Sequence, residues 1–117
     1  MSRDFRLYLV DICECCERVI AYVGDMSFED FSTDIKTIDA VVRNLEIIGE
    51  AIKKIPIDLL DRRPDIDWKN VARFRDIIAH YYFRVKLTVV WDIIQNELGP
   101  LKIAAADILS SLPADDN

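Results

Sequence analysis

The sequence predicts an all-α protein, folded as an antiparallel bundle of four to five helices in a single domain over residues 1–117. Three observations support this fold class. Apolar residues make up 51% of the chain and recur at steps of three and four, the period of an amphipathic helix. Only three glycines and four prolines interrupt these patterns. The length suits one domain with one continuous core and leaves no room for a separate catalytic domain.

The first half of the chain predicts two long helices. Residues 4–24 form an amphipathic pattern that closes near Gly24. Ser27 and Asp30 then have the spacing of a capping box, which predicts a short turn of helix. Residues 33–54 repeat the helical pattern around Gly49. Because glycine costs about 1 kcal/mol of helix propensity relative to alanine, we expect another helix to approach closely at this position.

The second half predicts a short helix over residues 56–61, which must stop before Pro64 because the residue preceding a proline disfavours helix. Asp65 or Asp67 then caps the next helix, which carries Arg75. The apolar pattern lapses after residues 82–83 and resumes over residues 86–112. Gly99 and Pro100 interrupt it, so we expect a kink or two consecutive helices there.

Net charge and its distribution limit the function classes. A net charge of −6 argues against a protein that coats nucleic acid through bulk electrostatics. Residues 62–86, however, hold seven basic and three acidic residues, so this window carries +4 and the rest of the chain −10. The first residues are charged and pass into an amphipathic segment, so we expect a cytoplasmic protein with no secretory or membrane-spanning segment.

Three cysteines, Cys13, Cys15 and Cys16, lie within about one helical turn. This spacing suits neither the usual zinc ligand pairs nor local disulfides, so we interpret them as reduced apolar residues of a helix. The sequence predicts no metal site and no cofactor.

The basic window contains the only histidine, His80, which follows Arg75 and Asp76 and precedes two tyrosines. Histidine is the side chain whose unperturbed pKa lies near neutrality, so it is the natural candidate for proton transfer. On a regular helix Arg75 and His80 lie about 140° apart, whereas Asp76 and His80 share a face. Either the helix ends or bends near Ala79, or Arg75 and His80 converge between two chains.

These residues resemble the motif of the HEPN superfamily, most closely its HepT toxin branch: Arg, a polar residue, three further residues, His, any residue, Tyr. Arg75, Asp76, His80 and Tyr82 fill the pattern in order. Residues 43–51 and 90–94 are also similar to stretches of that branch, so the resemblance covers most of the chain. It implies a HEPN-like helical domain that pairs as a homodimer, with the two motifs facing each other across a cleft.

The resemblance further implies a toxin that acts as a metal-independent endoribonuclease. One histidine suits RNA cleavage, because the ribose 2′-hydroxyl supplies the nucleophile and only a proton must be moved. The catalytic residues would be His80 as general acid and base, Arg75 on the scissile phosphate, and Asp76 orienting the imidazole. Arg73, Tyr82 and Arg84 would bind the RNA substrate.

The HepT branch also implies a protein partner, an MNT-type nucleotidyltransferase antitoxin that attaches AMP to the motif tyrosine. Here that residue is Tyr82, whereas Tyr81 falls outside the matched position. A bulky anion beside Arg75 and His80 would occupy the place of the substrate phosphate, which explains the inactivation by charge and by steric exclusion.

Two other function classes stay open from the sequence. The chain could be an inactive HEPN domain that holds substrate or nucleotide for a nucleotidyltransferase. It could also be a structural helical adaptor in which Trp91 and the apolar stripes form an oligomer interface. The polar residues Arg43, Asn44, Glu46 and Glu50 leave a similar choice between a solvated face and a cleft that faces the motif.

Overall fold

The structure, a computed structural model, describes residues 4–81 and 86–113, and of Ile77 and residues 79–81 it describes the backbone alone. All regular elements in these ranges are helices, which confirms the all-α prediction. In chain order they are α1 (Phe5–Val23), α2 (Phe28–Thr33), α3 (Ile35–Lys54), α4 (Ile57–Leu60), α5 (Trp68–Tyr81), α6 (Leu87–Asn96) and α7 (Leu98–Ser110).

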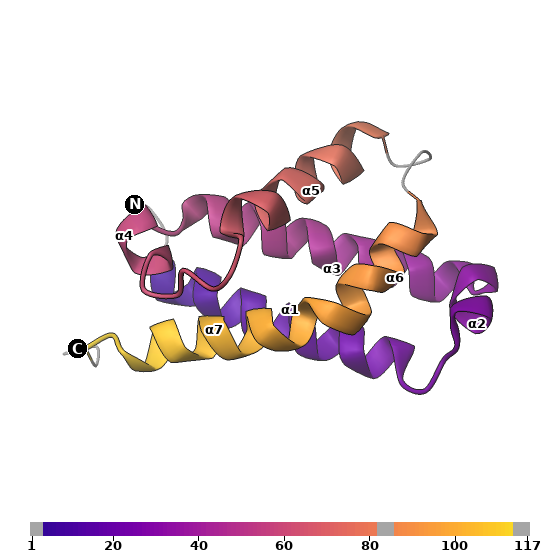
Figure 1. The fold of residues 1–117 in the computed structure, drawn as a ribbon, viewed down its shortest axis with the longest axis horizontal. Coiled ribbons are helices and arrows are strands. Elements are labelled where there is room, and N and C mark those ends of the chain that lie inside the picture. The colour runs from indigo at the N-terminus through magenta and orange to yellow at the C-terminus, as the bar shows by residue number, and fades with distance from the viewer. Residues whose placement is uncertain (1–3, 82–85, 114–117) are drawn as a thin grey trace.

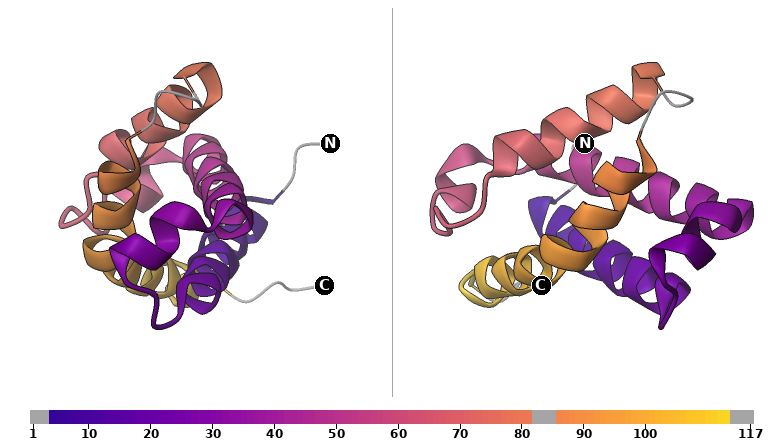
Figure 2. Two further views of the ribbon diagram at one scale, coloured as in Figure 1. Left: turned by 90° about the vertical axis from the view of Figure 1, so that its right-hand side faces the viewer. Right: turned by 45° about the vertical axis from the view of Figure 1, so that its right-hand side comes forward.

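The helices form an antiparallel bundle in which α1, α3 and α5 alternate in direction, and α6 and α7 together make the final return (Figure 1). The most extensive packing joins α1 to α3, α3 to α5, and α1 to α7. Figure 2 shows α5 resting on α3 at one side of the bundle, with α7 at the opposite side. The short helices α2 and α4 lie in the connections. None of the helices in the described ranges has both the length and the apolar character needed to cross a membrane.

The N-terminal helices end where the sequence predicts. Gly24 follows the last residue of α1 with φ of 51°, a left-handed conformation that glycine adopts without steric cost. The capping box is formed in full, because Asp30 N donates to Ser27 Oγ at 3.1 Å and Ser27 N donates to Asp30 Oδ2 at 3.2 Å. The second long helix begins at Ile35 rather than at residue 33, since the Asp34 carboxylate accepts a hydrogen bond from Thr37 N at 3.1 Å and caps α3.

The core is continuous and reaches all the long helices. Fully buried side chains come from each region of the bundle, including Phe31, Ile12, Ile48, Ile78, Val90, Leu98 and Ile108. Trp91 packs against the rings of Phe31 and Phe28, with centroid distances of 5.4 and 6.0 Å. Because these contacts lie within the chain, Trp91 serves the core where α2 meets α6. The adaptor interpretation had assigned it to an oligomer interface.

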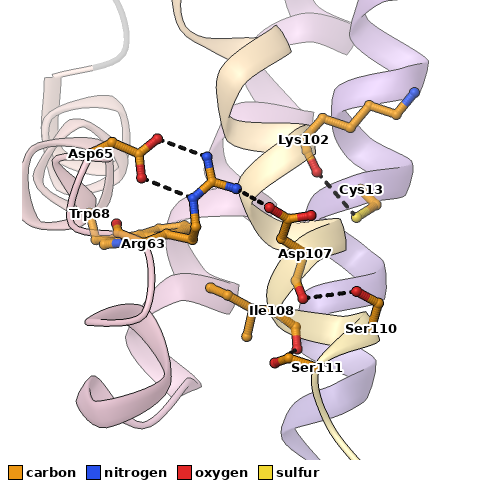
Figure 3. A network of polar contacts seen from close by, with 9 residues as sticks. All are labelled: Cys13, Arg63, Asp65, Trp68, Lys102, Asp107, Ile108, Ser110 and Ser111. Atoms are coloured by element: carbon orange, nitrogen blue, oxygen red, sulfur yellow. Dashed lines mark hydrogen bonds and ion pairs between the residues drawn. The ribbon is translucent and has the colours of Figure 1, made fainter.

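The cysteines lie on α1, as predicted, and face the core. Cys15 and Cys16 are buried, and burial raises the pKa of the Cys16 thiol to about 12. Cys13 is half-buried, and its Sγ lies 3.9 Å from the carbonyl oxygen of Lys102 on α7 (Figure 3). A thiol rather than a thiolate at these positions suits packing and not nucleophilic chemistry.

The start of α5 is fixed by polar contacts that reach α7. Asp67 caps α5, because its Oδ1 accepts a hydrogen bond from Asn70 N at 3.1 Å. The alternative cap, Asp65, instead accepts two hydrogen bonds from Arg63 at 2.9 and 2.8 Å. Arg63 also pairs with Asp107 on α7 at 2.6 Å (Figure 3). This guanidinium therefore joins the α4–α5 connection to the last helix.

Trp68, the first residue of α5, adds a second anchor. Its indole Nε1 donates to the carbonyl oxygens of Leu60 at 3.0 Å and Arg63 at 3.1 Å, while its ring is 7% exposed. A buried indole with a satisfied N–H fixes both the position and the direction of the chain that follows it. The N-terminal end of α5 is therefore held in place.

The interruption near Gly99 and Pro100 is confirmed as two consecutive helices, but the break falls at Glu97. Gly99 and Pro100 lie in the first turn of α7. Proline is tolerated there because the first amides of a helix have no partner within the helix. This break turns α6 away from α7 and sends it toward the end of α5 (Figure 1).

Candidate active site

The candidate site is built where α5 crosses α3 at Gly49. A Cβ atom on Gly49 would lie 2.2 Å from Cβ of Arg75 and 3.4 Å from its Cα, far inside normal contact distance. Only a residue without a side chain allows the two backbones to come this close. The predicted close approach is therefore confirmed, and the residue that approaches is the motif arginine.

Two carboxylates hold the guanidinium of Arg75. Its Nε lies 3.2 Å from Oε2 of Glu50 on α3, and its Nη1 lies 3.3 Å from Oδ1 of Asp76. Nε is buried and makes no well-aligned hydrogen bond, so Glu50 acts on it through charge. The Arg75 side chain is 27% exposed, which leaves part of the guanidinium open to an incoming anion.

Asp76 has a second cationic partner, Lys53 in the last turn of α3. The Lys53 ammonium, and after it the Arg75 guanidinium, hold the pKa of Asp76 below its ordinary value. Glu50, Arg75, Asp76 and Lys53 thus form one line of alternating charges, the α3–α5 charge chain. Their side chains are between 27% and 47% exposed. Ion pairs this exposed to solvent contribute little to stability, so the α3–α5 charge chain orients its members more than it stabilises the fold.

A hollow of about 300 Å³, the Arg75 groove, lies beside this charge chain. Its lining combines residues of α1 and α3 with Arg75, among them Tyr8, Arg43, Glu46 and Glu50. Arg43 brings a second guanidinium to the groove and lies 3.4 Å from Glu46. Of the four polar residues for which the sequence left a choice between a solvated face and a cleft, three (Arg43, Glu46 and Glu50) thus line a cleft that contains the motif arginine.

Asn44, the fourth of these polar residues, belongs to the core. It is 6% exposed, and its Nδ2 donates to the carbonyl oxygen of Ala40 at 2.8 Å. Its Oδ1 is buried without a hydrogen-bond partner. Periodicity could not separate Asn44 from its neighbours, because a polar residue on the inward strip of a helix has no distinguishing sequence signal.

His80 lies in the last turn of α5. The helix runs unbroken from Trp68 to Tyr81, so its last residue lies two positions beyond Ala79, and convergence between two chains stays a prediction. The Cα positions of Arg75 and His80 are therefore about 140° apart around the helix axis, while Asp76 and His80 share a face. The side chain of His80 lies outside the described residues, so its pairing with Asp76 stays a prediction.

The predicted substrate-binding residues do not all lie at the Arg75 groove. Arg73 is exposed and lines a different cavity, which lies between α5 and α6. Tyr82 and Arg84 lie outside the described residues. Sequence reasoning missed Lys53, which pairs with Asp76. A signal was available, because Lys53 lies one turn after Gly49, where a crossing helix was predicted.

The basic window divides in two in the structure. Arg63 is paired with carboxylates, and Arg62 Nη1 donates to Ser111 Oγ at 2.8 Å, so both serve the junction with α7. Lys69, Arg73 and Lys86 are exposed. Within this window, the exposed basic residues that do not serve the junction with α7 therefore lie on α5 and just before α6.

The comparisons with known proteins agree with this arrangement. The family model described as Ribonuclease HepT-like matches residues 12–108, a range that contains Gly49, the α3–α5 charge chain and His80. The chain belongs to the HepT-like ribonuclease family. This family is part of the HEPN superfamily, so the resemblance seen in the sequence is confirmed.

Several HepT-like relatives match over nearly their whole length. Putative RNase MJ0127 of Methanocaldococcus jannaschii is 42% identical over 98% of this chain and 95% of that protein. Probable ribonuclease HepT of Thermococcus cleftensis is 43% identical over 87% of this chain and 93% of that protein. A third relative from M. jannaschii, named Gamma-glutamylcyclotransferase and putative RNase MJ0434, is 36% identical over the full chain and 53% of its own length. No solved structure gave a significant match.

Proposed function

We propose that this chain is a metal-independent endoribonuclease, the toxin of a toxin–antitoxin module, and that it cuts RNA in a cleft between two copies. The observation that carries the proposal is the crossing of α3 and α5 at Gly49. This crossing fixes Arg75 in the Arg75 groove, and the helix that carries Arg75 also carries His80. Membership in the HepT-like ribonuclease family and relatives named as ribonucleases support the same activity.

The reaction needs proton transfer and stabilisation of charge on a phosphate. The ribose 2′-hydroxyl attacks the adjacent phosphorus, the bond from phosphorus to the 5′ oxygen breaks, and the products are a 2′,3′-cyclic phosphate and a 5′-hydroxyl end. His80 moves the proton, since histidine is the side chain whose unperturbed pKa lies near neutrality. Arg75, whose planar guanidinium can contact two phosphate oxygens, stabilises the charge that develops in the transition state.

A second copy of the chain supplies what one chain lacks. Removing a proton from the 2′-hydroxyl and returning one to the leaving oxygen normally uses two groups, and each chain has one histidine. The angular separation of Arg75 and His80 on a continuous helix also favours convergence across a two-fold interface, the commonest geometry of homodimers. Sedimentation tests this step, and a stable monomer with full cleavage activity contradicts it.

Neutralisation by a nucleotidyltransferase antitoxin that adenylylates Tyr82 belongs to the same proposal. The phosphate of an attached AMP would place negative charge where the substrate phosphate binds. Arg75 and Arg43, which both line the Arg75 groove, offer guanidinium groups that would hold such a phosphate. The modified protein would then be blocked by its own substrate-binding charges.

Purified protein incubated with RNA, with and without EDTA, tests the proposed activity. We expect cleavage in EDTA, with cyclic phosphate ends, and its loss in Arg75→Ala and His80→Ala. Arg18→Ala is the matched control, because Arg18 is exposed on α1 and lies 4.0 Å from Glu14. Dependence on added metal refutes the mechanism. Binding without cleavage in the wild type supports the inactive-domain alternative, and neither binding nor cleavage supports the structural adaptor.

A further inference from the structure

A second cavity lies on the other side of α5 from the Arg75 groove. Its volume is about 300 Å³, and it is bounded by α3, α5, α6 and the start of α7, where Figure 1 shows α5 and α6 spreading apart over α3. We call it the α5–α6 cavity. It shares no lining residue with the Arg75 groove, so the mechanism described above makes no use of it.

The interior of the α5–α6 cavity is mostly apolar. Its floor consists of core side chains that are at most 5% exposed, namely Leu45, Ile48, Leu98 and Leu101. Its walls are Val71 and Phe74 from α5 and Val89 and Ile93 from α6. Val89 is 44% exposed and stands at the opening. An aromatic ring among aliphatic walls suits a planar, apolar-faced ligand.

Polar groups border this cavity on two sides. Arg73 and Asn70 come from α5, and Asp92 and Glu97 come from α6 and the residue that follows it. Among the described residues, none donates a side-chain hydrogen bond to the Glu97 carboxylate, whereas Asp92 accepts one from Asn96 at 2.7 Å. Burial, and then the charges of Asp92 and Asp67, raise the pKa of Glu97. Glu97 is therefore a partly desolvated acceptor that gains from an N–H donor.

We propose that the α5–α6 cavity is a base-binding pocket for the RNA substrate and that it binds guanine through Glu97. Guanine alone among the four RNA bases presents two adjacent N–H donors, N1–H and N2–H, which match the two oxygens of one carboxylate. Adenine and cytosine present a single exocyclic amino group beside an acceptor. Uracil presents one N–H between two carbonyl oxygens, which a carboxylate repels. Single-stranded RNA is read in this way, with bases turned out and bound by their Watson–Crick edges.

Arg73 gives the pocket a contact with the RNA backbone. It is exposed, lines the cavity, and lies two residues before Arg75 on the same helix. A spacing of two residues places Arg73 and Arg75 on opposite sides of α5, about one helix diameter of 10–12 Å apart. Arg73 therefore lies on the path of a strand that leads from the α5–α6 cavity around α5 toward the Arg75 groove. The guanine is a neighbour of the cleaved linkage rather than the nucleotide that is attacked.

The inference rests on the proposed ribonuclease function only in naming RNA as the source of the base, so its first test does not use cleavage. Binding of 5′-GMP, AMP, CMP and UMP to the full chain is measured by equilibrium dialysis. We expect GMP to bind most tightly, and Glu97→Gln to weaken it roughly ten- to a hundredfold, because one charge-assisted hydrogen bond pair is lost. Glu14→Gln makes the same change at an exposed carboxylate on α1 and should leave GMP binding unchanged.

Two further variants locate the bound nucleotide. Val89→Trp, which fills the opening of the cavity from an exposed position, should abolish GMP binding without unfolding the protein. Arg75→Ala should leave GMP binding intact, because Arg75 lines the other hollow. Equal affinity for all four nucleotides, or GMP binding that is lost in Arg75→Ala but kept in Glu97→Gln and Val89→Trp, overturns the assignment.

Cleavage mapping then separates this inference from the proposed function. On an RNA with guanines replaced by inosine, which lacks the N2 amino group, we expect cleavage beside those positions to fall about as much as in Glu97→Gln. Cleavage without any dependence on guanine overturns the pocket and leaves the nuclease. Binding of GMP that depends on Glu97, in a protein that cuts no RNA, supports the pocket and refutes the nuclease.

Discussion

Gly49→Ala is the most direct perturbation of the candidate site, because it adds one carbon atom at the crossing of α3 and α5. The new Cβ would lie 2.2 Å from Cβ and 2.9 Å from Cγ of Arg75, whereas ordinary contacts are 3.4–4 Å. Cβ is bonded directly to the backbone of α5, so rotation of the Arg75 side chain cannot move it aside. The two helices must therefore separate by more than about 1 Å, a relief that overpacked cores obtain only at a cost.

The size of the effect follows from two opposing contributions. Replacing glycine by alanine inside a helix stabilises the folded state by about 1 kcal/mol, and overpacking costs about 1–3 kcal/mol. The net change in unfolding free energy is thus a destabilisation of roughly 0–2 kcal/mol. The effect on cleavage should be larger, since a displacement of about 1 Å in a positioned catalytic group can lower the rate about a hundredfold.

Gly99→Ala supplies the matched control. Gly99 is helical in α7, has a negative φ, and has nothing within 4 Å of where its Cβ would lie. This variant should gain the helix propensity without the overpacking, so the two alanine variants should differ by about 1–3 kcal/mol in urea unfolding. If Gly49→Ala is as stable as Gly99→Ala and cleaves RNA at the wild-type rate, α5 does not rest on α3 as described.

Three other perturbations test the candidate site and its anchors. Asp76→Asn should lower cleavage less than His80→Ala does, and full activity across the pH range would show that Asp76 does not orient the histidine. Because the folded-state pKa of Asp76 is depressed, its stabilising contribution is present above the unfolded value near 3.8 and is lost as the pH falls through the lower folded value. Wild type and Asp76→Asn should therefore converge in stability only as the pH falls well below 3.8, as measured by urea unfolding. Trp68→Phe removes the donor to two carbonyl oxygens and should cost about 1–3 kcal/mol, against less than about 0.5 kcal/mol for a surface change such as Lys69→Ala. Tyr82→Phe should escape adenylylation by the partner enzyme while it keeps part of its nuclease activity, and mass spectrometry that finds AMP on Tyr81 alone contradicts the assignment.

Local signals in the sequence predicted the helices well, because caps and breakers act over a few residues. Ser27 with Asp30, Gly24 and Pro56 all stand at helix ends in the structure. The choice between Asp65 and Asp67 could not be made in the same way. Arg63 binds Asp65, and the position of Arg63 depends on Asp107, which is 44 residues away.

The sequence predicted several residues of the candidate site but not the ion pairs between α3 and α5. Gly49 indicated a close crossing, and Arg75 and Asp76 were recognised by their motif. That Lys53 and Glu50 would hold them could not be read from the chain, because the azimuth of one helix relative to another is set by packing across the whole crossing. The α5–α6 cavity escaped prediction for the same reason, since its volume depends on the angle at which α6 leaves α7.

The end of α5 that carries His80 is sensitive to small changes in how α5 packs on α3. Within the described residues α5 packs extensively on α3 alone, is anchored at Trp68, and crosses Gly49 at Arg75. His80 lies five residues beyond the Gly49 crossing, which is about 7.5 Å along the helix axis. A rotation of only about 8° at the crossing would displace the backbone of His80 by about 1 Å. Substitutions in α4, or in parts of α3 that do not line the Arg75 groove, can thus displace the end of α5 that carries His80.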